Sequence, residues 1–505
     1  MPLADVTRRT FVAATGAAVA ALAGLPQRIL ADPYAPIPTW RRKLAPIRVR
    51  GRVSIAGRAA PGVAVTDGHG VALTARDGSY SLVSASDRPW VSVSLPTGCR
   101  IPTSATGTAR MHAPITPDTR GEAIARFDFD RAAGDDARHR FVVLADTQTQ
   151  DAFEMTRLHA ETVPDVQRAM GNASAGQRFG IACGDIMFDE LALYPEYERA
   201  VAAMGIPFLQ VVGNHDLNFD ARTSETATRT FERHFGPPWY SLNVGEIHYV
   251  VLNDVLWYGD GYLGYLTAEQ LAWLAADLAA VERGRPVVVA LHIPAGSTRW
   301  QRTSDRDEKR GETVNNKEAL LRLLEPYRAH LISGHTHEME HLSYGGTEEH
   351  VLGTACGAWW SGDICHDGTP NGFGVFEAHG SDLRWTYHST GKPAEHQMRV
   401  YPPGADSRAP DEVVANVWSW DPQWTVVWYA NGERKGAMAR RVGLDPQAVK
   451  EQTGPDLPAR RKWVEPTPTA HLFYATPPDG TSEVVVEATD PWGHKFSERL
   501  ALTAR

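Results

Sequence analysis

Six short apolar runs lie in the middle of the chain, each too short for an ordinary helix. They are FVVLAD (141–146), RFGIACGD (178–185), FLQVVGN (208–214), HYVVLND (248–254), PVVVALH (286–292) and HLISGH (330–335). Continuous apolar runs of this length are typical of strands buried on both faces. Segments with helical spacing lie between them, namely 193–205, 267–284 and 316–328. This alternation predicts an α/β domain over residues 134–392.

The flanking segments have a different pattern, in which apolar and polar residues alternate between frequent glycine turns. Residues 48–130 predict a small β-sandwich, and TARDGSYSL (74–82) resembles the transthyretin-like or carboxypeptidase-regulatory domain. The sandwich has no cluster of catalytic residue types, which indicates a structural accessory domain. Alternation returns in residues 393–505, which predict a C-terminal all-β domain. The stretch 354–376 is compatible with either side of this boundary.

The N-terminus has the pattern of an export signal. Arg8 and Arg9 form a twin-arginine motif before the apolar run VAATGAAVAALAGL, which is too short and alanine-rich to span a membrane. We expect residues 1–31 to be a signal peptide and 32–47 a proline-rich linker. Twin-arginine export would deliver a folded protein to the periplasm or the exterior. The alternative is an ordinary amphipathic N-terminal helix.

Composition narrows the class of protein. The chain has 505 residues, which is too long for one ordinary core, and its net charge is −9. No lysine- or arginine-rich block follows the first fifty residues, so we expect no nucleic-acid partner. The four cysteines do not form a disulfide framework or a zinc-finger motif. Cys356 and Cys365 are close enough in sequence to pair, and the spacing leaves that question open.

Side chains with metal-ligating chemistry follow five of the six apolar runs. In α/β sheets the carboxyl ends of the strands meet at one edge, where ligands bind, so these residues are expected to converge. Each of them alone has an ordinary explanation as a turn residue or a core histidine. Together they predict a shared metal centre, whose candidate ligands are Asp146, Gln148, Asp185, Asn214, His292, His335 and His337.

The donor set indicates which ions would bind. Carboxylate, amide and imidazole groups without thiolates suit two divalent ions of Mn, Fe, Zn or Mg better than a structural zinc. Asp185 could bridge the two ions and hold them about 4 Å apart. Such a pair can turn water into hydroxide near neutral pH and stabilise an in-line displacement at phosphorus.

The ordered motifs resemble the calcineurin-like metallophosphoesterases, in the bacterial subgroup with an N-terminal β-sandwich and a C-terminal β-domain. They are Asp-x-Gln (146–148), Gly-Asp-x-x-x-Asp (184–189), GNHD (213–216), a lone histidine (292) and GHTH (334–337). The resemblance implies a fold of two packed sheets flanked by helices. It also implies that Asp146, Gln148, Asp185 and His337 hold the first ion, and that Asp185, Asn214, His292 and His335 hold the second.

The same resemblance gives His215 and Asp216 catalytic roles. His215 would contact the phosphate and protonate or stabilise the leaving oxygen, with Asp216 as its orienting partner. Two positions depart from the family pattern. Gln148 stands where most members have histidine, so the first site is expected to bind its metal more loosely or to favour Mn, Mg or Fe. Phe188 stands where purple acid phosphatases have a tyrosine ligand, which excludes that branch.

Aromatic residues after the strands and a polar insert are the candidate substrate contacts. Aromatic residues follow the strands at Trp239, Tyr240, Trp257 and Tyr258, where they could stack on a group next to the phosphate. Trp359 and Trp360 could do the same or pack between domains. The polar insert 297–316 could form a rim that contacts a second anionic group, or an ordinary solvated loop. Its arginines are Arg299, Arg302, Arg306 and Arg310.

Two hypotheses of different classes follow. The first is a metal-dependent hydrolase of small phosphate esters, in which the same centre would serve monoesters or diesters. The alternative is a non-catalytic cell-envelope binding protein with a vestigial metal core, and the intact His215 argues against it. Nuclease action would need a basic groove that the sequence does not show. The pattern does not indicate an oligomeric state.

Overall fold

The computed structural model describes residues 45–171, 177–303, 310–455 and 457–502. Residues Pro46–Arg505 form one compact unit, which contains nearly all of the described residues. The predicted signal peptide and most of the linker lie outside the described residues, so export and a periplasmic or secreted location stay predictions. Among the described residues, no helix is both long and apolar enough to cross a membrane.

The N-terminal segment forms the β-sandwich expected from its alternating pattern. In one sheet β1 pairs antiparallel with β2 and β5 and parallel with β8. The second sheet has the order β4-β3-β6-β7. Alternate residues of β1, such as Val49 and Val53, are fully buried between the sheets. The strands are β1 (Pro46–Ile55), β2 (Arg58–Ala59), β3 (Ala64–Thr66), β4 (Val71–Leu73), β5 (Ser79–Ala85), β6 (Trp90–Val93), β7 (His112–Pro114) and β8 (Glu122–Phe129).

The central domain consists of two sheets that pack face to face. The first sheet has the order β11-β10-β9-β20-β21 and the second β12-β13-β16-β17-β19-β18. The six predicted apolar runs overlap β9 (Arg138–Leu144), β10 (Gln177–Ala182), β11 (Phe208–Gln210), β13 (Ile247–Val251), β16 (Pro286–Ala290) and β17 (Arg328–Ser333). The remaining strands are β12 (Tyr240–Val244), β18 (Glu340–Tyr344), β19 (Thr347–Val351), β20 (Gly372–His379) and β21 (Asp382–Ser389). A separate hairpin joins β14 (Val255–Trp257) to β15 (Tyr262–Gly264).

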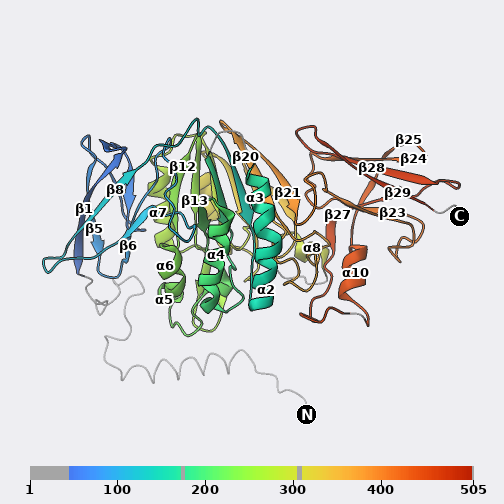
Figure 1. Cartoon of the computed structure of the whole chain (residues 1–505), viewed down its shortest axis with the longest axis horizontal. Coiled ribbons are helices and arrows are strands. Elements are labelled where there is room, and N and C mark those ends of the chain that lie inside the picture. Colours follow the sequence, from blue (N-terminus) through green and yellow to red (C-terminus); the bar gives the residue numbers. More distant parts are fainter. Residues whose placement is uncertain (1–44, 172–176, 304–309, 456, 503–505) are drawn as a thin grey trace, which may run out of the picture. The chain divides into compact units, whose positions relative to one another are not determined.

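Helices cover the outer faces of these sheets (Figure 1). The helix α4 begins with proline at its first turn and ends at Gly205 in the left-handed conformation, which favours glycine. In α7, Thr267 caps the first turn by accepting a hydrogen bond from the Gln270 backbone. The elements are α2 (Ala152–Arg157), η1 (Leu158–Thr162), α3 (Val163–Gly171), η2 (Leu191–Leu193), α4 (Tyr194–Met204), η3 (Asn214–Asp216), α5 (Ser224–Ala227), α6 (Arg229–Phe235), α7 (Ala268–Leu278), α8 (Arg299–Arg302) and α9 (Lys317–Leu324).

The C-terminal segment forms a second all-β domain, whose described residues include one helix. Its sheets have the orders β22-β23-β27-β26 and β25-β24-β28-β29, and they enclose a core of their own around Val413, Val426 and Val486. The elements are β22 (Arg399–Tyr401), β23 (Val413–Asn416), β24 (Thr425–Ala430), β25 (Glu433–Ala437), β26 (Ala439–Gly443), α10 (Pro446–Gln452), β27 (Thr469–Ala475), β28 (Glu483–Thr489) and β29 (Lys495–Ala501).

The predicted fold class is confirmed: a two-sheet α/β sandwich flanked by helices lies between two β-domains. The stretch 354–376, which the sequence left on either side of the boundary, leads into β20. Because β20 pairs antiparallel with β9, the end of this stretch belongs to the central sheet.

Candidate metal centre

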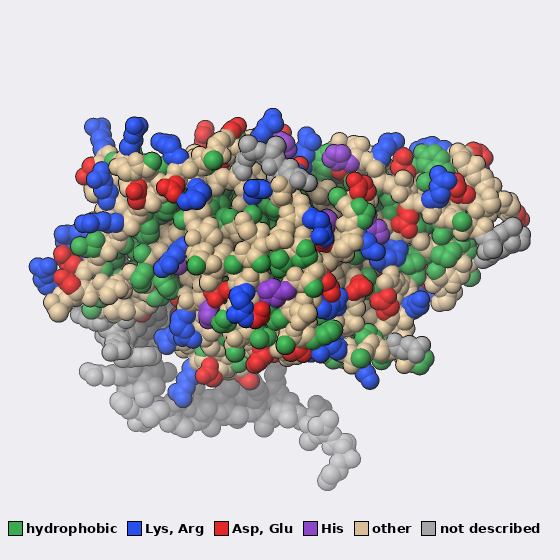
Figure 2. Space-filling view, in the orientation of Figure 1, with side chains coloured by type: hydrophobic (Ala, Val, Ile, Leu, Met, Phe, Trp, Pro, Cys, Tyr) green, Lys and Arg blue, Asp and Glu red, His purple; other side chains and the backbone are tan. Residues whose placement is uncertain are grey.

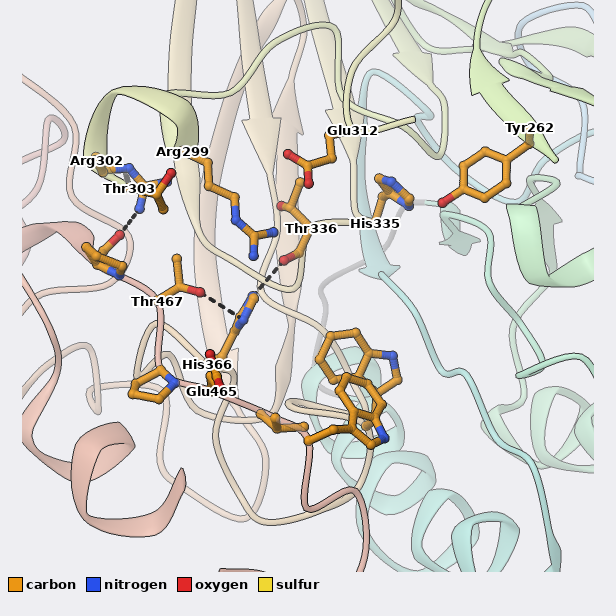
Figure 3. Close-up of a pocket in the computed structure, with 15 residues that line it drawn as sticks. Tyr262, Arg299, Arg302, Thr303, Glu312, His335, Thr336, His366, Glu465 and Thr467 are labelled. Atoms are coloured by element: carbon orange, nitrogen blue, oxygen red, sulfur yellow. Dashed lines mark hydrogen bonds between the residues drawn. The ribbon is translucent and has the colours of Figure 1, made fainter. Parts of the chain in front are cut away.

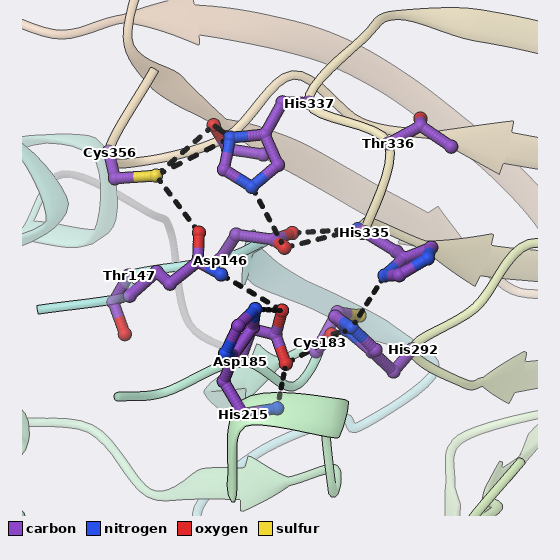
Figure 4. Close-up of polar contacts among 12 residues, drawn as sticks. Asp146, Thr147, Cys183, Asp185, His215, His292, His335, Thr336, His337 and Cys356 are labelled. Carbon is purple, nitrogen blue, oxygen red and sulfur yellow. Dashed lines mark hydrogen bonds and ion pairs between the residues drawn. The ribbon is translucent and has the colours of Figure 1, made fainter. Parts of the chain in front are cut away.

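The predicted ligands meet where the two central sheets end together (Figure 4). Asp146 follows β9, Asp185 follows β10 and Asn214 follows β11, all in the first sheet. His292 follows β16, and His335 and His337 follow β17, in the second sheet. Pairing continues past the strand ends, because the Cys183 backbone donates to Leu144 and the Gly334 backbone donates to the carbonyl of His292. The loops that carry the ligands are therefore held in register.

The backbone at this edge adopts a conformation that L-residues rarely take. Eleven non-glycine residues in the described chain have positive φ, and most of them belong to the site or its surroundings. Such residues persist only where surrounding contacts hold them, and they cluster at functional sites. Those at the centre are Asp146, Gln148, Asp185, Asp189, His335, His337, Trp359 and Trp360.

Two glycines allow the ligand loops to approach closely. A Cβ added at Gly213 would lie 1.9 Å from the Asp185 backbone nitrogen, and one added at Gly334 would lie 2.2 Å from Asp146 Oδ2. Neither neighbour can move, because one is backbone and the other is a fully buried carboxylate. The glycines in GNHD and GHTH therefore give space to the two carboxylates that the ligands surround.

Hydrogen bonds to backbone carbonyls fix which nitrogen of each histidine faces the centre. His292 donates from Nδ1 to the Cys183 carbonyl at 2.8 Å, so its Nε2 presents a lone pair to the centre. That lone pair meets only other acceptors: Asn214 Oδ1 at 3.1 Å, Asp185 Oδ1 at 3.2 Å and His335 Nδ1 at 3.2 Å. A group of facing acceptors without a donor requires a cation or an added proton.

The other two histidines have the same arrangement. His335 donates from Nε2 to the Gly311 carbonyl at 2.9 Å, and His337 donates from Nδ1 to the Gly357 carbonyl at 2.6 Å. The remaining nitrogen of His337 lies 3.4 Å from Asp146 Oδ1. Metal-ligating histidines are usually oriented by a hydrogen bond from the second ring nitrogen, and all three imidazoles here are oriented in this way.

The electrostatics of the centre favour positive charge. Burial lowers the pKa of His292, but the charge of Asp185 outweighs this effect and raises the pKa to about 10. Burial also lowers the pKa of His335, to about 3, with the charge of His292 adding to the effect. Without a metal, a proton on His292 therefore compensates the buried carboxylates. A divalent ion would take its place, so the residues fit the metal that their chemistry implies.

The two amide ligands lie within the same group. Asn214 is in η3 and its Oδ1 faces His292, as stated above. Gln148 donates from Nε2 to Asp185 Oδ2 at 3.1 Å, and its Oε1 lies 3.9 Å from Cys356 Sγ. All seven predicted ligand residues are thus brought together. Their individual roles as ligands remain predictions.

His215 also lies at the centre, but its orienting partner is not the one expected. Its Nδ1 is 2.6 Å from Asp189 Oδ1, and its Nε2 lies 4.0 Å from Asp185 Oδ2. The ring stacks on Phe188 with centroids 4.5 Å apart. Burial lowers the pKa of His215, and the charges of Asp185 and Asp189 together raise it above its ordinary value.

The prediction that Asp216 orients His215 is wrong. Asp216 is fully buried and accepts hydrogen bonds from the backbone of Gly213, Ile186 and Met187, and from the Tyr194 hydroxyl at 3.0 Å. It therefore joins the loop after β11 to the loop after β10. Asp216 positions two ligand loops, whereas Asp189 positions the imidazole.

We expect the Asp189→Asn variant to lower kcat about tenfold, at the lower end of the loss usual for a group that orients a site residue. KM and bound metal should stay within twofold, because Asp189 has no contact with the predicted ligands other than through His215. Steady-state kinetics and elemental analysis check this. Asp220→Asn, which changes an exposed carboxylate of the following loop, is the matched control. Loss of metal in Asp189→Asn alone would contradict the assigned role.

Three of the four predicted substrate aromatics are occupied elsewhere. The indole of Trp239 donates to the Gly68 carbonyl of the N-terminal sandwich, and the buried Tyr240 hydroxyl accepts from the Gln210 backbone. The buried Trp257 donates to the Ala221 carbonyl. Tyr258 is exposed, but neither it nor the other three lines the opening at the metal centre. The assignment of Trp239, Tyr240 and Trp257 to substrate is therefore corrected to packing between elements.

The opening at the metal centre is a cavity of about 650 Å³ with a different set of aromatic walls (Figure 3). Trp359 stacks on His337, with ring centroids 4.0 Å apart, and lies 4.7 Å from the ring of Trp463 in the C-terminal domain. Tyr262 lies on the other side of His335. Sequence reasoning missed Tyr262 and Trp463, because no local pattern relates them to the ligand motifs. Trp360, in contrast, is buried and donates to the Thr147 carbonyl.

Two arginines of the insert after His292, Arg299 and Arg302, pair with glutamates of the protein. Arg302 is nearly buried and pairs with Glu338 at 2.7 Å and Glu340 at 3.1 Å, so it is neither a solvated charge nor free for an anion. Arg299 is 3.2 Å from the other oxygen of Glu338 and lines the cavity. Arg310 is exposed, and Arg306 lies outside the described residues. All four cysteines are buried and free, including Cys356 and Cys365.

Three family models match the chain in consecutive segments. They are the N terminal of calcineurin-like phosphoesterase at residues 47–132, calcineurin-like phosphoesterase at 139–339 and the C terminal of calcineurin-like phosphoesterase at 349–496. The chain belongs to the calcineurin-like phosphoesterase family. As a member of that family it is a metal-dependent phosphoester hydrolase. The predicted family and the predicted enzyme class are confirmed.

Solved structures similar to this calcineurin-like phosphoesterase are distant. A purple acid phosphatase from yellow lupin (Lupinus luteus) is 13% identical, with 68% of this chain and 67% of that chain covered and a TM-score of 0.38. The anchor of the inner membrane complex of Plasmodium is 16% identical, with 50% and 84% covered and a TM-score of 0.33. Phosphopantetheinyl hydrolase from Mycobacterium tuberculosis is 12% identical, with 43% and 90% covered and a TM-score of 0.29. No curated protein matches the chain.

Proposed function

We propose that this phosphoesterase hydrolyses small phosphate esters with two divalent metal ions. The observation that carries the proposal is the convergence of lone pairs on His292, His335 and Asp185, with a second group of acceptors at Asp146 and His337. These groups face one another at 3.1–3.4 Å with no donor between His292 and its neighbours. Such an arrangement is stable only around positive charge.

The acceptors fall into two groups around Asp185, which supports two ions rather than one. In Figure 4, Asp146 and His337 lie toward Cys356, whereas His292 and His335 lie on the other side. Gln148 belongs to the first group, because its Oε1 is 3.9 Å from Cys356 Sγ, and Asn214 belongs to the second, because its Oδ1 is 3.1 Å from His292 Nε2. Asp185 contacts both groups, through Gln148 at Oδ2 and His292 at Oδ1. When bound, a pair of divalent ions would lower the pKa of water to about 7 and neutralise the charge on the oxygens of a phosphoryl group.

The side chains of this protein supply the remaining steps. His215 presents Nε2 beside the carboxylate shared by the two groups, and Asp189 holds its other nitrogen. With its pKa raised, the imidazole holds a proton that it can give to the leaving oxygen. The ligand carboxylates of Asp146 and Asp185 are buried, which shields them from bulk water.

The cavity supports a small-molecule substrate. Its volume of about 650 Å³ lies in the range of ligand sites, and its walls combine aromatic faces with Arg299 and Glu312. Trp359 and Trp463 offer adjacent indole faces for a planar or apolar group attached to the phosphate. On the face in Figure 2, basic and acidic side chains of the described residues are intermixed.

Elemental analysis and a substrate panel test the proposed function. Protein purified without added metal should contain at least two equivalents of divalent ion per chain. It should hydrolyse p-nitrophenyl phosphate, bis-p-nitrophenyl phosphate or glycerophosphodiesters in the presence of Mn²⁺, and a chelator should abolish this turnover. The preferred member of the panel decides between monoester and diester action. One equivalent of metal, or turnover that resists the chelator, would contradict a two-ion hydrolase.

We expect Trp463→Ala to raise KM about tenfold for substrates with a bulky leaving group, because a stacked aromatic contributes about 1 kcal/mol or more. kcat should change less, since Trp463 has no contact with the predicted ligands. Steady-state kinetics on the best substrate of the panel measure both values. Tyr258→Ala, which removes an exposed ring outside the cavity, is the matched control. An equal rise of KM in Tyr258→Ala would instead favour the prediction that Tyr258 contacts the substrate.

A further inference from the structure

We propose that His330, Glu348 and His350 form a second metal site, for one Zn²⁺ ion, separate from the catalytic centre. In the described part of the chain, two groups of three residues place their ligand atoms within 4.8 Å of one another. One is Asp185, His292 and His335 of the centre described above. The other is this group, whose three residues lie on β17 and β19.

Strand register brings the three side chains to one face of the sheet. In the parallel pairing of β17 with β19, His330 lies opposite Glu348, and His350 follows two residues later on the same face. His330 is near the start of β17, whereas the catalytic His335 follows its end. Five residues of extended chain separate them by roughly 16 Å, so the two groups cannot share an ion.

The distances suit a tetrahedral ion. His330 Nδ1 and His350 Nε2 are 3.1 Å apart, and His330 Nδ1 lies 4.0 Å from Glu348 Oε2. Ligand atoms at about 2.0–2.1 Å from a tetrahedral zinc are about 3.4 Å from each other. The two nitrogens are slightly closer than this and the Glu348 oxygen slightly farther, so small side-chain rotations bring all three atoms to ligand separation.

A third histidine orients the ligand from behind. His350 Nδ1 lies 3.1 Å from His341 Nδ1, across the antiparallel pair of β18 and β19. His341 Nε2 in turn lies 3.3 Å from the Ser419 hydroxyl of the C-terminal domain. When His350 donates to His341 and His341 donates to Ser419, the lone pair on His350 Nε2 points to His330. This is the hydrogen-bonding pattern of a metal-ligating histidine.

The two histidines of the group are in the neutral form that binds a metal ion. Burial, with the charge of Arg328 adding to it, lowers the pKa of His330 to about 4. Burial and the two neighbouring imidazoles lower the pKa of His350 well below its ordinary value. Both rings are therefore neutral at pH 7, and an ion need not displace a proton from them. Glu348 supplies the negative charge of the group. Burial raises the pKa of its carboxyl, and the nearby charge of Asp421 raises that pKa further.

A cavity of about 310 Å³ gives an ion access to the group. Its lining includes His330 and Glu348 from the central domain and Gln423 and Trp492 from the C-terminal domain. There is room in it for a water molecule as the fourth ligand. Because Ser419 anchors the histidine chain from the C-terminal domain, a bound Zn²⁺ would stabilise the contact between the two domains.

Zinc counting on purified full-length protein tests the proposal. Wild type, His330→Gln and Glu348→Gln are equilibrated with Zn²⁺, dialysed and analysed for zinc per chain. The control is His379→Gln, which removes an exposed histidine 3.9 Å from Glu377. We expect both variants to hold one equivalent less than wild type and control. Phosphate-ester turnover should remain within twofold, since neither residue contacts the catalytic centre.

Zn²⁺ should also raise the Tm of wild-type protein more than that of either variant. Glu348→Gln keeps the proposal testable if His330→Gln fails to fold, because Glu348 lies at the surface end of the group. An unchanged zinc count in the folded variants would overturn the proposal and leave the three histidines as a hydrogen-bonded chain. The zinc content per chain does not depend on activity, so it can be interpreted even if the protein does not hydrolyse phosphate esters.

Discussion

Asp185→Asn is expected to abolish phosphate-ester turnover, with a loss of about 10³ or more, the effect of removing a main electrostatic element of a site. Asp185 is fully buried and contacts both groups of acceptors, through Gln148 and His292. An asparagine has the same shape but no charge, so neither group retains enough negative charge to hold a divalent ion. Both ions should therefore be lost together.

Kinetics and elemental analysis on the same preparation measure this result. The fold should survive, because asparagine Oδ1 can still accept from the His215 backbone as Asp185 does at 2.9 Å. Circular dichroism checks that point, and Asp260→Asn in an exposed loop is the matched control. Loss of only one ion would show that Asp185 does not join the two groups.

His215→Ala is expected to slow turnover about 10²–10⁴-fold while both ions stay bound, because general acid catalysis typically contributes that much. The imidazole lies 4.0 Å from Asp185 and is held by Asp189, outside the group of lone pairs that faces the ions. The loss should depend on the leaving group. An alkoxide needs a proton to depart, whereas p-nitrophenolate does not.

The comparison of alkyl and p-nitrophenyl phosphates is therefore the informative measurement. A larger loss on the alkyl substrate supports proton donation by His215, and an equal loss would assign it to binding the phosphoryl oxygens instead. His234→Ala, which removes a partly exposed histidine beside Glu198, is the matched control. A metal-free His215→Ala protein would contradict the separation between ligands and acid.

The ligand set was predictable because each member is tied to a local pattern. An apolar run predicts a buried strand, and the residue after it lies at the carboxyl edge of the sheet, wherever the strand stands in the order. Asp146, Asp185 and His292 could therefore be assigned without knowing the strand order. The glycines of GNHD and GHTH added to the signal because their close approaches, at Gly213 and Gly334, are part of the same motifs.

The partners of these residues were harder to predict. Asp216 is next to His215 in sequence, but consecutive residues in η3 point in different directions, and Asp216 faces the loop after β10. Asp189, from that other loop, faces the imidazole. Likewise the pairing of Arg302 with Glu338 depends on where the chain returns after β17, and no local pattern encodes that distance.

The sequence by itself determined the three-part organisation, the α/β centre and the identity of the residues at its carboxyl edge, because hydrophobic period and residue chemistry are local properties. Only the tertiary structure decided which aromatic rings line the cavity, which carboxylate orients His215 and which histidines of neighbouring strands meet. Those features depend on packing between segments far apart in the chain. Packing of this kind covers Trp239 with the N-terminal sandwich and brings Trp463 of the C-terminal domain to the cavity.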